Sequence, residues 1–107
     1  MADAADRLAG CEGFDWDDGN ASKLRARHRV SPGEAEQVFF QAPLVVAHDA
    51  EHSADEERFY ALGQTAGARR LFLVFTQRGP LIRVLSARDM NRRERRIYER
   101  TEEASDD

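Results

Sequence analysis

Residues 77–100, QRGPLIRVLSARDMNRRERRIYER, decide the expected fold because they place a strand directly before a basic helix. The apolar run at 81–87 predicts the strand, and residues 89–100 predict the helix. Arg83 and Arg88 lie where the strand delivers them to the start of that helix. Because a planar guanidinium binds phosphate through two hydrogen bonds, we expect a phosphate-binding site at this junction.

Three strands are predicted at residues 59–65, 70–77 and 81–87, and short turns that contain glycine join them. Short turns connect antiparallel neighbours, so these strands predict a meander in which the most apolar one, 70–77, is central. An apolar run at 44–47 predicts another strand, and residues 13–17 predict a short one near the start of the chain.

Two helices are expected between the strands at 13–17 and 44–47. The first has Asp17 or Asp18 as its N-cap and ends near Arg29. The second begins with a capping box in the sequence SPGE at residues 31–34 and ends before Pro43, which cannot continue it.

The expected order is therefore strand, helix, helix, four strands and helix. Helices that segregate from an antiparallel meander define the α+β class, here an antiparallel β-sheet with two N-terminal helices and one C-terminal helix. We expect the helices to cover one face of the sheet and to leave the other open for a ligand. Ser86 and Asp89 are the expected caps of the C-terminal helix.

Length and composition fit one domain. A chain of 107 residues predicts a single domain over residues 13–100, between flexible acidic tails at 1–12 and 101–107. No apolar run approaches the roughly 18 residues that span a bilayer, and the N-terminus lacks a signal-peptide pattern. Cys11 is the only cysteine, which excludes an internal disulfide, and we expect a cytoplasmic protein.

Charge is distributed unevenly along the chain. The formal net charge of −4 argues, taken alone, against a nucleic-acid binder. The last third is nevertheless rich in arginine, with Arg78, Arg83, Arg88, Arg92, Arg93, Arg95, Arg96 and Arg100. Such a set suits an RNA phosphate, whose charge it would stabilise during cleavage. The alternative is that arginines at strand edges are solvated and discourage strand pairing.

Strand alternation assigns these arginines to faces of the sheet. Arg58 and Tyr60 share one face of their strand, while Arg83 and Arg88 are predicted to lie on opposite faces of theirs. Glu94 lies along the apolar stripe of the last helix. It either pairs with a strand arginine, which is the commoner outcome, or acts as a base.

His28 is flanked by Arg27 and Arg29. Neighbouring cations disfavour a charged imidazole, so His28 is a candidate for proton exchange near neutral pH. The alternative is a histidine at a helix end, where the helix dipole favours it.

His52 lies in a polar loop with Asp49, Ser53 and Glu57. Composition allows a Ser/His/Asp triad, or a metal site that also uses His48, but neither spacing is diagnostic. Ordering of the loop by its acidic and hydroxyl side chains is the favoured interpretation.

Taken together, the motifs resemble the BrnT toxin family. They are FDWD at 14–17, RH at 27–28, VS at 30–31, EA at 34–35, VF at 38–39, HSxxEER at 52–58, RxxSAR at 83–88, Glu94 and Tyr98. The resemblance covers roughly residues 14–99. The chain departs from the family pattern in four places. Lysine is usual where Asn20 stands, and asparagine is usual where Leu24 stands. Lys-His-Gly is usual where Arg27-His28-Arg29 stands, and a phenylalanine is usual near Pro32.

The resemblance implies a RelE-like fold and a type II toxin–antitoxin ribonuclease that suppresses translation and growth. It implies that no metal or other cofactor is needed, since basic side chains stabilise charge while the RNA 2′-hydroxyl attacks the adjacent phosphate. The implied partner is a BrnA-like antitoxin with a ribbon-helix-helix domain, through which the complex binds operator DNA.

Residue roles follow from the resemblance and the patterns above. The expected catalytic residues are His28, Arg58, Arg83, Arg88 and Glu94. The expected RNA contacts are Arg27, Arg78, Arg92 and Tyr98, and the expected loop-ordering residues are Asp49, His52 and Glu57.

A second class of function stays open. The same scaffold suits a non-catalytic nucleic-acid-binding or protein-interaction module, a degenerate toxin that keeps the arginines but not the chemistry. Nucleic-acid binding weakens steeply with salt, which separates it from pure protein interaction.

Overall fold

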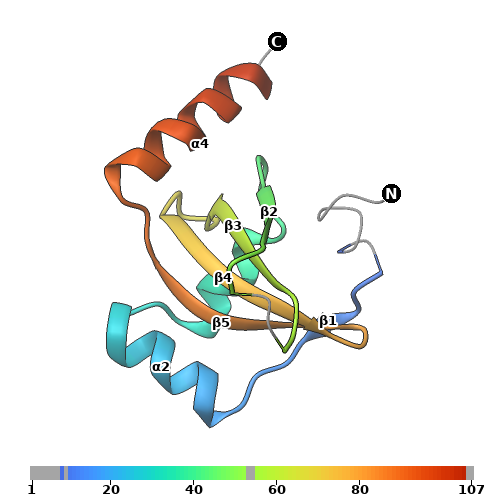
Figure 1. Ribbon diagram of the computed structural model, residues 1–107. Helices are drawn as coiled ribbons and strands as arrows, with labels where there is room; N and C mark the ends of the chain where they lie inside the picture. Colours follow the sequence, from blue (N-terminus) through green and yellow to red (C-terminus); the bar gives the residue numbers. More distant parts are fainter. Residues whose placement is uncertain (1–7, 9, 53–54, 106–107) are drawn as a thin grey trace.

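The computed structural model describes residues 8, 10–52 and 55–105. Its elements are β1 (Gly13–Phe14), α2 (Asp18–His28), α3 (Pro32–Val38), β2 (Val45–Asp49), β3 (Arg58–Gln64), β4 (Arg70–Arg78), β5 (Leu81–Asp89) and α4 (Arg92–Ser105) (Figure 1). This confirms the α+β class, with the predicted order of strands and helices. Residues 1–7 of the predicted N-terminal tail and Ser53 of the predicted loop lie outside the described residues.

The five strands form one mixed sheet in the order β1-β5-β4-β3-β2. β2 to β5 make the expected antiparallel meander, but β1 pairs parallel to β5, with Gly13 opposite Leu81. The prediction of a purely antiparallel sheet is therefore wrong. β1 is only two residues long and lies at the edge of the sheet. All the other elements before β5 lie between β1 and β5 in the sequence, so no local pattern predicts that these two strands pair.

A β-bulge interrupts the pairing of β4 with β5. Val74 lies opposite Ser86 and Phe75 lies opposite Val84, so Leu85 is the extra residue of β5. The bulge reverses the alternation, because Val84 and Ala87 both face the core. Arg83 and Arg88 consequently lie on the same face, which corrects the prediction that they lie on opposite faces.

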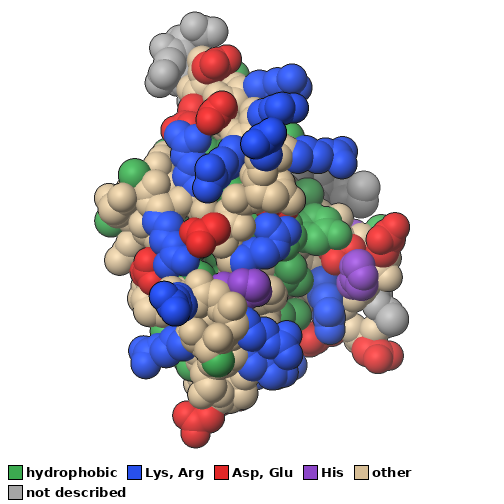
Figure 2. Space-filling model, turned by 90° about the vertical axis from the view of Figure 1, so that its left-hand side faces the viewer, with side chains coloured by type: hydrophobic (Ala, Val, Ile, Leu, Met, Phe, Trp, Pro, Cys, Tyr) green, Lys and Arg blue, Asp and Glu red, His purple; other side chains and the backbone are tan. Residues whose placement is uncertain are grey.

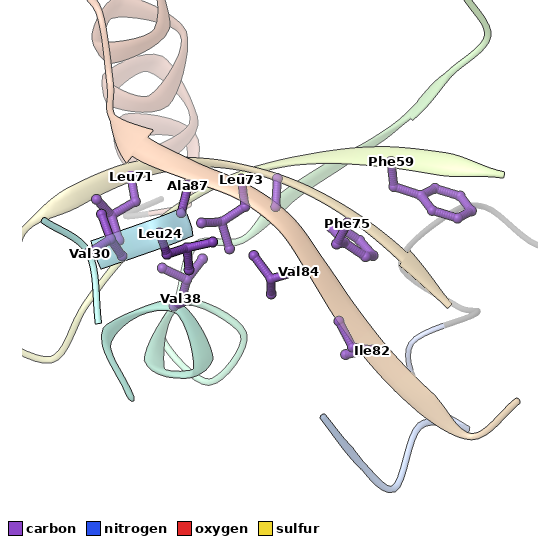
Figure 3. Packing of buried hydrophobic residues seen from close by; sticks show 12 residues of the cluster. Leu24, Val30, Val38, Phe59, Leu71, Leu73, Phe75, Ile82, Val84 and Ala87 are labelled. Atoms are coloured by element: carbon purple, nitrogen blue, oxygen red, sulfur yellow. The ribbon is translucent and has the colours of Figure 1, made fainter. Parts of the chain in front are cut away.

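α2 and α3 cover one face of the sheet. Leu24 of α2 and Val38 of α3 join Leu73 and Val84 of the sheet in the main core cluster, and all four are buried. Figure 3 shows these side chains meeting in the layer between the sheet and the two helices. These two helices and the sheet therefore enclose the main core of the protein.

α4 packs on the opposite face, so the expectation that all helices share one face is wrong. Its Tyr98 is fully buried in a second cluster with Leu62 and Met90, and Val45 and Phe72 pack against it. The Tyr98 hydroxyl donates a 2.7 Å hydrogen bond to the carbonyl of Pro43. Tyr98 thus anchors the middle of α4 against the sheet, and Figure 1 shows the C-terminal end of the helix extending away from it.

The helix starts follow the predicted capping chemistry in two of three cases. Asp17 caps α2 in a capping box with Asn20, and Ser31 caps α3 with Glu34. α4 is capped instead by Asn91, whose side chain accepts from the Glu94 N–H at 2.8 Å.

The predicted caps of α4 are wrong because β5 is longer than expected. Its residues through Asp89 still pair with β4, where Asp89 lies opposite Leu71. α4 also continues to Ser105 instead of ending at Arg100. Within the described residues, no helix is long and apolar enough to cross a membrane.

Candidate functional site

A hollow of about 510 Å³ opens on the face of the sheet that α2 and α3 leave free. Tyr60 of β3 and Phe72 and Val74 of β4 line it, with Lys23 and Arg58 as its cations. The register explains this arrangement, since Tyr60 pairs with Val74. Side chains that are direct cross-strand neighbours share a face, so β3 and β4 contribute to one surface.

Two half-buried aromatic rings line the hollow. The rings of Tyr60 and Phe72 are 5.5 Å apart between centroids and tilted by 38°. The Arg88 guanidinium lies over the Phe72 ring, 4.2 Å from its centroid. Aromatic faces next to cations are the surfaces on which unpaired bases of single-stranded RNA stack.

The carboxylate of Asp49 holds the ring of His52 at the rim of this hollow. His52 Nδ1 lies 2.9 Å and 3.2 Å from the two carboxylate oxygens, and the His52 N–H donates to Asp49 at 3.3 Å. The Asp49 side chain is 4% exposed, whereas that of His52 is 59% exposed. A buried acceptor therefore orients a solvent-facing imidazole.

The pKa of Asp49 reflects these contacts. Burial raises the pKa of the carboxyl, but hydrogen bonds from the Tyr60 hydroxyl and from His52 outweigh burial and lower it below its usual value. The same hydrogen bond to Asp49 raises the pKa of Tyr60. Asp49 is consequently an anion, and the predicted loop-ordering contact between Asp49 and His52 is present.

Arg83 lies on the open face but is held by carboxylates. Its side chain is 12% exposed, and its guanidinium donates to both carboxylate oxygens of Asp17, at 3.0 Å and 3.2 Å. Asp15 lies 3.5 Å from it. The hydrogen bond from Arg83 lowers the pKa of Asp17. Arg83 thus joins β5 to the start of α2.

Arg88 and Glu94 form a two-pronged ion pair, with N–O distances of 2.8 Å and 2.9 Å. Burial raises the pKa of Glu94, but the hydrogen bonds from Arg88 and from the Asn91 N–H lower it overall. The expectation that Glu94 pairs with a strand arginine is confirmed. A carboxylate held in this way at the α4 N-terminus is an anion and a poor proton acceptor.

His28 lies at the exposed C-terminal end of α2, outside the main hollow. It lines a smaller hollow of about 50 Å³ with Arg27 and with Lys23 and Ser86, which also line the large one. The two hollows are therefore neighbours along the α2–β5 edge, and the predicted catalytic histidine lies on the far side of Lys23 and Ser86 from Arg58.

Two of the positions that depart from the family pattern, Asn20 and Leu24, have structural roles. Asn20 is 4% exposed and donates from Nδ2 to the carbonyls of Asp15 and Val84, at 3.0 Å and 3.1 Å. Leu24 is buried in the core. Neither faces the large hollow. Lys23, which was not among the predicted site residues, is the cation that α2 contributes to the large hollow. The sequence offered one signal for it, because Lys23 is the only lysine of the chain.

The other predicted contacts are dispersed. Arg27 and Arg92 are exposed on α2 and α4. Arg78 lies at the end of β4, 3.5 Å from Glu56. Tyr98 cannot contact RNA, because its side chain is fully buried; its predicted role is corrected to packing.

Cations frame the open face. Figure 2 shows Lys and Arg side chains gathered in the upper and lower parts of the molecule. Hydrophobic side chains are visible between them. The exposed arginines beside or on α2 and α4 include Arg25, Arg27, Arg29, Arg92, Arg93, Arg96 and Arg100. An apolar groove of about 480 Å³ between α4 and the sheet shares Tyr60 and Phe72 with the hollow.

This arrangement can bind an anionic polymer and act on a phosphate. Cations at the rim attract the backbone, while aromatic and apolar side chains accept the bases. Among the described residues, no three histidine, cysteine, aspartate or glutamate side chains gather as a metal site would require.

Comparison with known proteins supplies the family. Residues 16–94, more than half of the chain, match the family described as the ribonuclease toxin, BrnT, of type II toxin–antitoxin systems. A search of curated proteins finds no match. The matched residues contain every residue that lines the large hollow. The chain belongs to the BrnT family of ribonuclease toxins.

Proposed function

We propose that this protein is an endoribonuclease that cleaves single-stranded RNA on the open face of its sheet without a metal, and thereby inhibits translation and growth. The observation that supports this most directly is the hollow that combines Lys23 and Arg58 with the half-buried rings of Tyr60 and Phe72. It offers cations for the phosphate and stacking surfaces for the flanking bases. Membership of a ribonuclease toxin family supports the same chemistry.

In this proposal the 2′-hydroxyl of RNA attacks the adjacent phosphate, and Arg58 stabilises the negative charge that develops. Arg58 is half-buried and lies opposite Asp49 in the pairing of β2 with β3, so its place is defined by the sheet and not by a loop. Arg83 and Arg88 frame the site from β5, where carboxylates fix their positions. The catalytic role of His28 stays a prediction.

The proposed partner is a BrnA-like ribbon-helix-helix antitoxin that neutralises the toxin, and through which the complex binds operator DNA. A basic face suits an acidic or amphipathic antitoxin segment as well as RNA. Binding of RNA and of the antitoxin would then be mutually exclusive.

The test is cleavage of single-stranded RNA by the purified chain in excess EDTA. The parent is expected to leave 2′,3′-cyclic phosphate ends, and Arg58→Ala is expected to slow cleavage about 100-fold, the usual cost of removing a charge-stabilising donor. Arg100→Ala is the matched control, because Arg100 is exposed and lines neither the hollow nor the groove.

Two further variants test individual roles. Arg58→Lys keeps the positive charge but removes the planar guanidinium group, and His28→Ala tests the predicted catalytic role of His28. Binding of RNA by the parent without cleavage would contradict the enzyme and would favour the non-catalytic nucleic-acid-binding module. Cleavage that EDTA abolishes would contradict the metal-independent mechanism.

A further inference from the structure

The pair of Asp49 and His52 has a geometry that loop ordering does not require. Nδ1 of His52 lies between the two oxygens of a carboxylate that is almost wholly buried. An ionised carboxylate only accepts hydrogen bonds, so Nδ1 carries the proton in the neutral ring. The lone pair of the neutral ring is then on Nε2.

Nε2 is available to a substrate. The His52 side chain is 59% exposed, and no group in the described part of the chain bonds to its Nε2. The ring lines the large hollow together with Arg58 and Tyr60, and a second hollow with Arg58 and Glu56. His52 therefore shares two surfaces with the arginine that we place on the phosphate.

His48 shows that this geometry is specific to His52. It lies on β2 only four positions earlier, but it pairs with Phe59, on the core-facing side of the sheet, and lines neither hollow. Its Nε2 lies 3.6 Å from the exposed Glu57 carboxylate. A histidine only four residues away thus lacks both the buried acceptor and the place in the site.

We propose that His52 is the general base of RNA cleavage and that Asp49 is its positioning residue; this rests on the proposed ribonuclease function. Nε2 takes the proton of the ribose 2′-hydroxyl, the 2′-oxygen bonds to the adjacent phosphorus, and the bond from phosphorus to the 5′-oxygen breaks. The 5′-oxygen takes a proton from water. The hydroxide so formed takes the proton from the imidazolium, which restores the neutral ring.

Asp49 contributes in two ways. It fixes the tautomer that leaves Nε2 as the acceptor, and its negative charge stabilises the imidazolium that forms when the proton arrives. Its own position is fixed by burial and by the hydrogen bond from Tyr60.

The decisive measurement is single-turnover cleavage of RNA by the full chain with His52→Ala, with His48→Ala as the matched control. The expected loss for His52→Ala is about 100-fold or more, as for other general bases, while His48→Ala keeps the parent rate. Added imidazole is expected to restore part of the His52→Ala rate, which a purely structural histidine would not allow.

A substrate with sulfur in place of the bridging 5′-oxygen separates the two proton-transfer roles. A thiolate leaves without protonation, so the defect of His52→Ala should persist with this substrate if His52 is the base. Disappearance of the defect would overturn the assignment, because it would make His52 the acid for the leaving group.

Asp49→Asn keeps the shape of the positioning residue and removes its charge. The charged and titratable groups around His52 are Asp49 on β2, Arg58 and Tyr60 on β3, Asp55 and Glu56 in the loop, and Lys23 on α2. Asp49→Asn should slow single-turnover cleavage in the parent background but should cause no further loss in the His52→Ala background, because Asp49 acts through His52. An equal loss in both backgrounds would contradict the positioning role.

The two proposals fail differently. A parent chain that cleaves RNA while His52→Ala cleaves equally well would overturn the role of His52 and leave the ribonuclease intact. A parent chain that does not cleave RNA would overturn both.

Discussion

At the scale of single residues, side chains that look interchangeable in the sequence have different tasks. Arg58 faces the hollow, Arg83 joins β5 to α2 through Asp17, and Arg88 is paired with Glu94 over an aromatic ring. The surroundings of each arginine, and not the residue type, therefore distinguish their places in the molecule.

Gly63 is a residue whose importance comes from one close contact. A Cβ at this position would lie 2.5 Å from Cγ1 of Val38, which is fully buried and β-branched. Gly63→Ala is therefore expected to lower the free energy of unfolding by about 1–3 kcal/mol, as overpacking does. Urea denaturation of the parent and the variant measures this.

Gly67→Ala is the matched control for that experiment. A Cβ at Gly67, in the exposed turn before β4, would lie 3.8 Å from the nearest atom, a Thr65 hydroxyl oxygen. An equal loss of stability in both variants would show that the α3–β3 contact is not the cause.

At the scale of helices and strands, the side chain of Arg69 connects the C-terminal end of β5, the first turn of α3 and the C-terminal end of α2. It donates to Asp89 at the end of β5 at 2.8 Å and to Glu34 in α3 at 3.1 Å. It also donates to the carbonyls of His28 and Arg29, where α2 ends. The hydrogen bond from Arg69 lowers the pKa of Asp89. The pKa of Glu34 is lowered by the Ser31 N–H first and by Arg69 second.

Arg69→Met is expected to lower the free energy of unfolding by about 1–2 kcal/mol at pH 7, since these ion pairs are only partly buried. Carboxyls with a lowered folded pKa stabilise the fold above their unfolded pKa, and this stabilisation is lost as pH falls through the folded value. The difference between parent and variant should therefore shrink below pH of about 4. Denaturation at a series of pH values measures it.

Arg25→Met is the control for Arg69. Arg25 is exposed on α2 and has no salt bridge within the described residues. A difference between parent and Arg69→Met that stays constant down to pH 2 would exclude the two carboxylates as its source.

At the scale of the whole molecule, the formal net charge is −4, yet Figure 2 shows many Lys and Arg side chains gathered on one side of the molecule. Exposed arginines of α2 and α4 are among the cations of the chain. The net charge alone therefore does not exclude the proposed binding of RNA, because a ligand interacts with the local charge of one face.

RNA affinity is expected to fall linearly on logarithmic axes as salt rises, with a slope of about −0.7 for each phosphate neutralised on a single strand. Lys23→Ala and Arg93→Ala, which change cations of the hollow and the groove, should each reduce the slope by about 0.7. Arg100→Ala should change it less. Titration at several salt concentrations measures this, and a parent slope near zero would contradict an electrostatic RNA interface.

Much of this protein was determined by its sequence alone, because the signals are local. The order of strands and helices follows from runs of apolar residues and from turns, and the starts of α2 and α3 follow from caps that act within four residues. Arg58 and Tyr60 were placed on one face because alternation holds along β3.

Only the tertiary structure decided the rest, because it depends on pairing between distant segments. The parallel addition of β1 and the bulge at Leu85 are set by cross-strand register, and the bulge puts Arg83 and Arg88 on one face. The ring of His52 is oriented by a carboxylate that is buried only when β2 pairs with β3. Burial, register and hydrogen-bond partners arise when the chain closes on itself, so no local pattern could specify them.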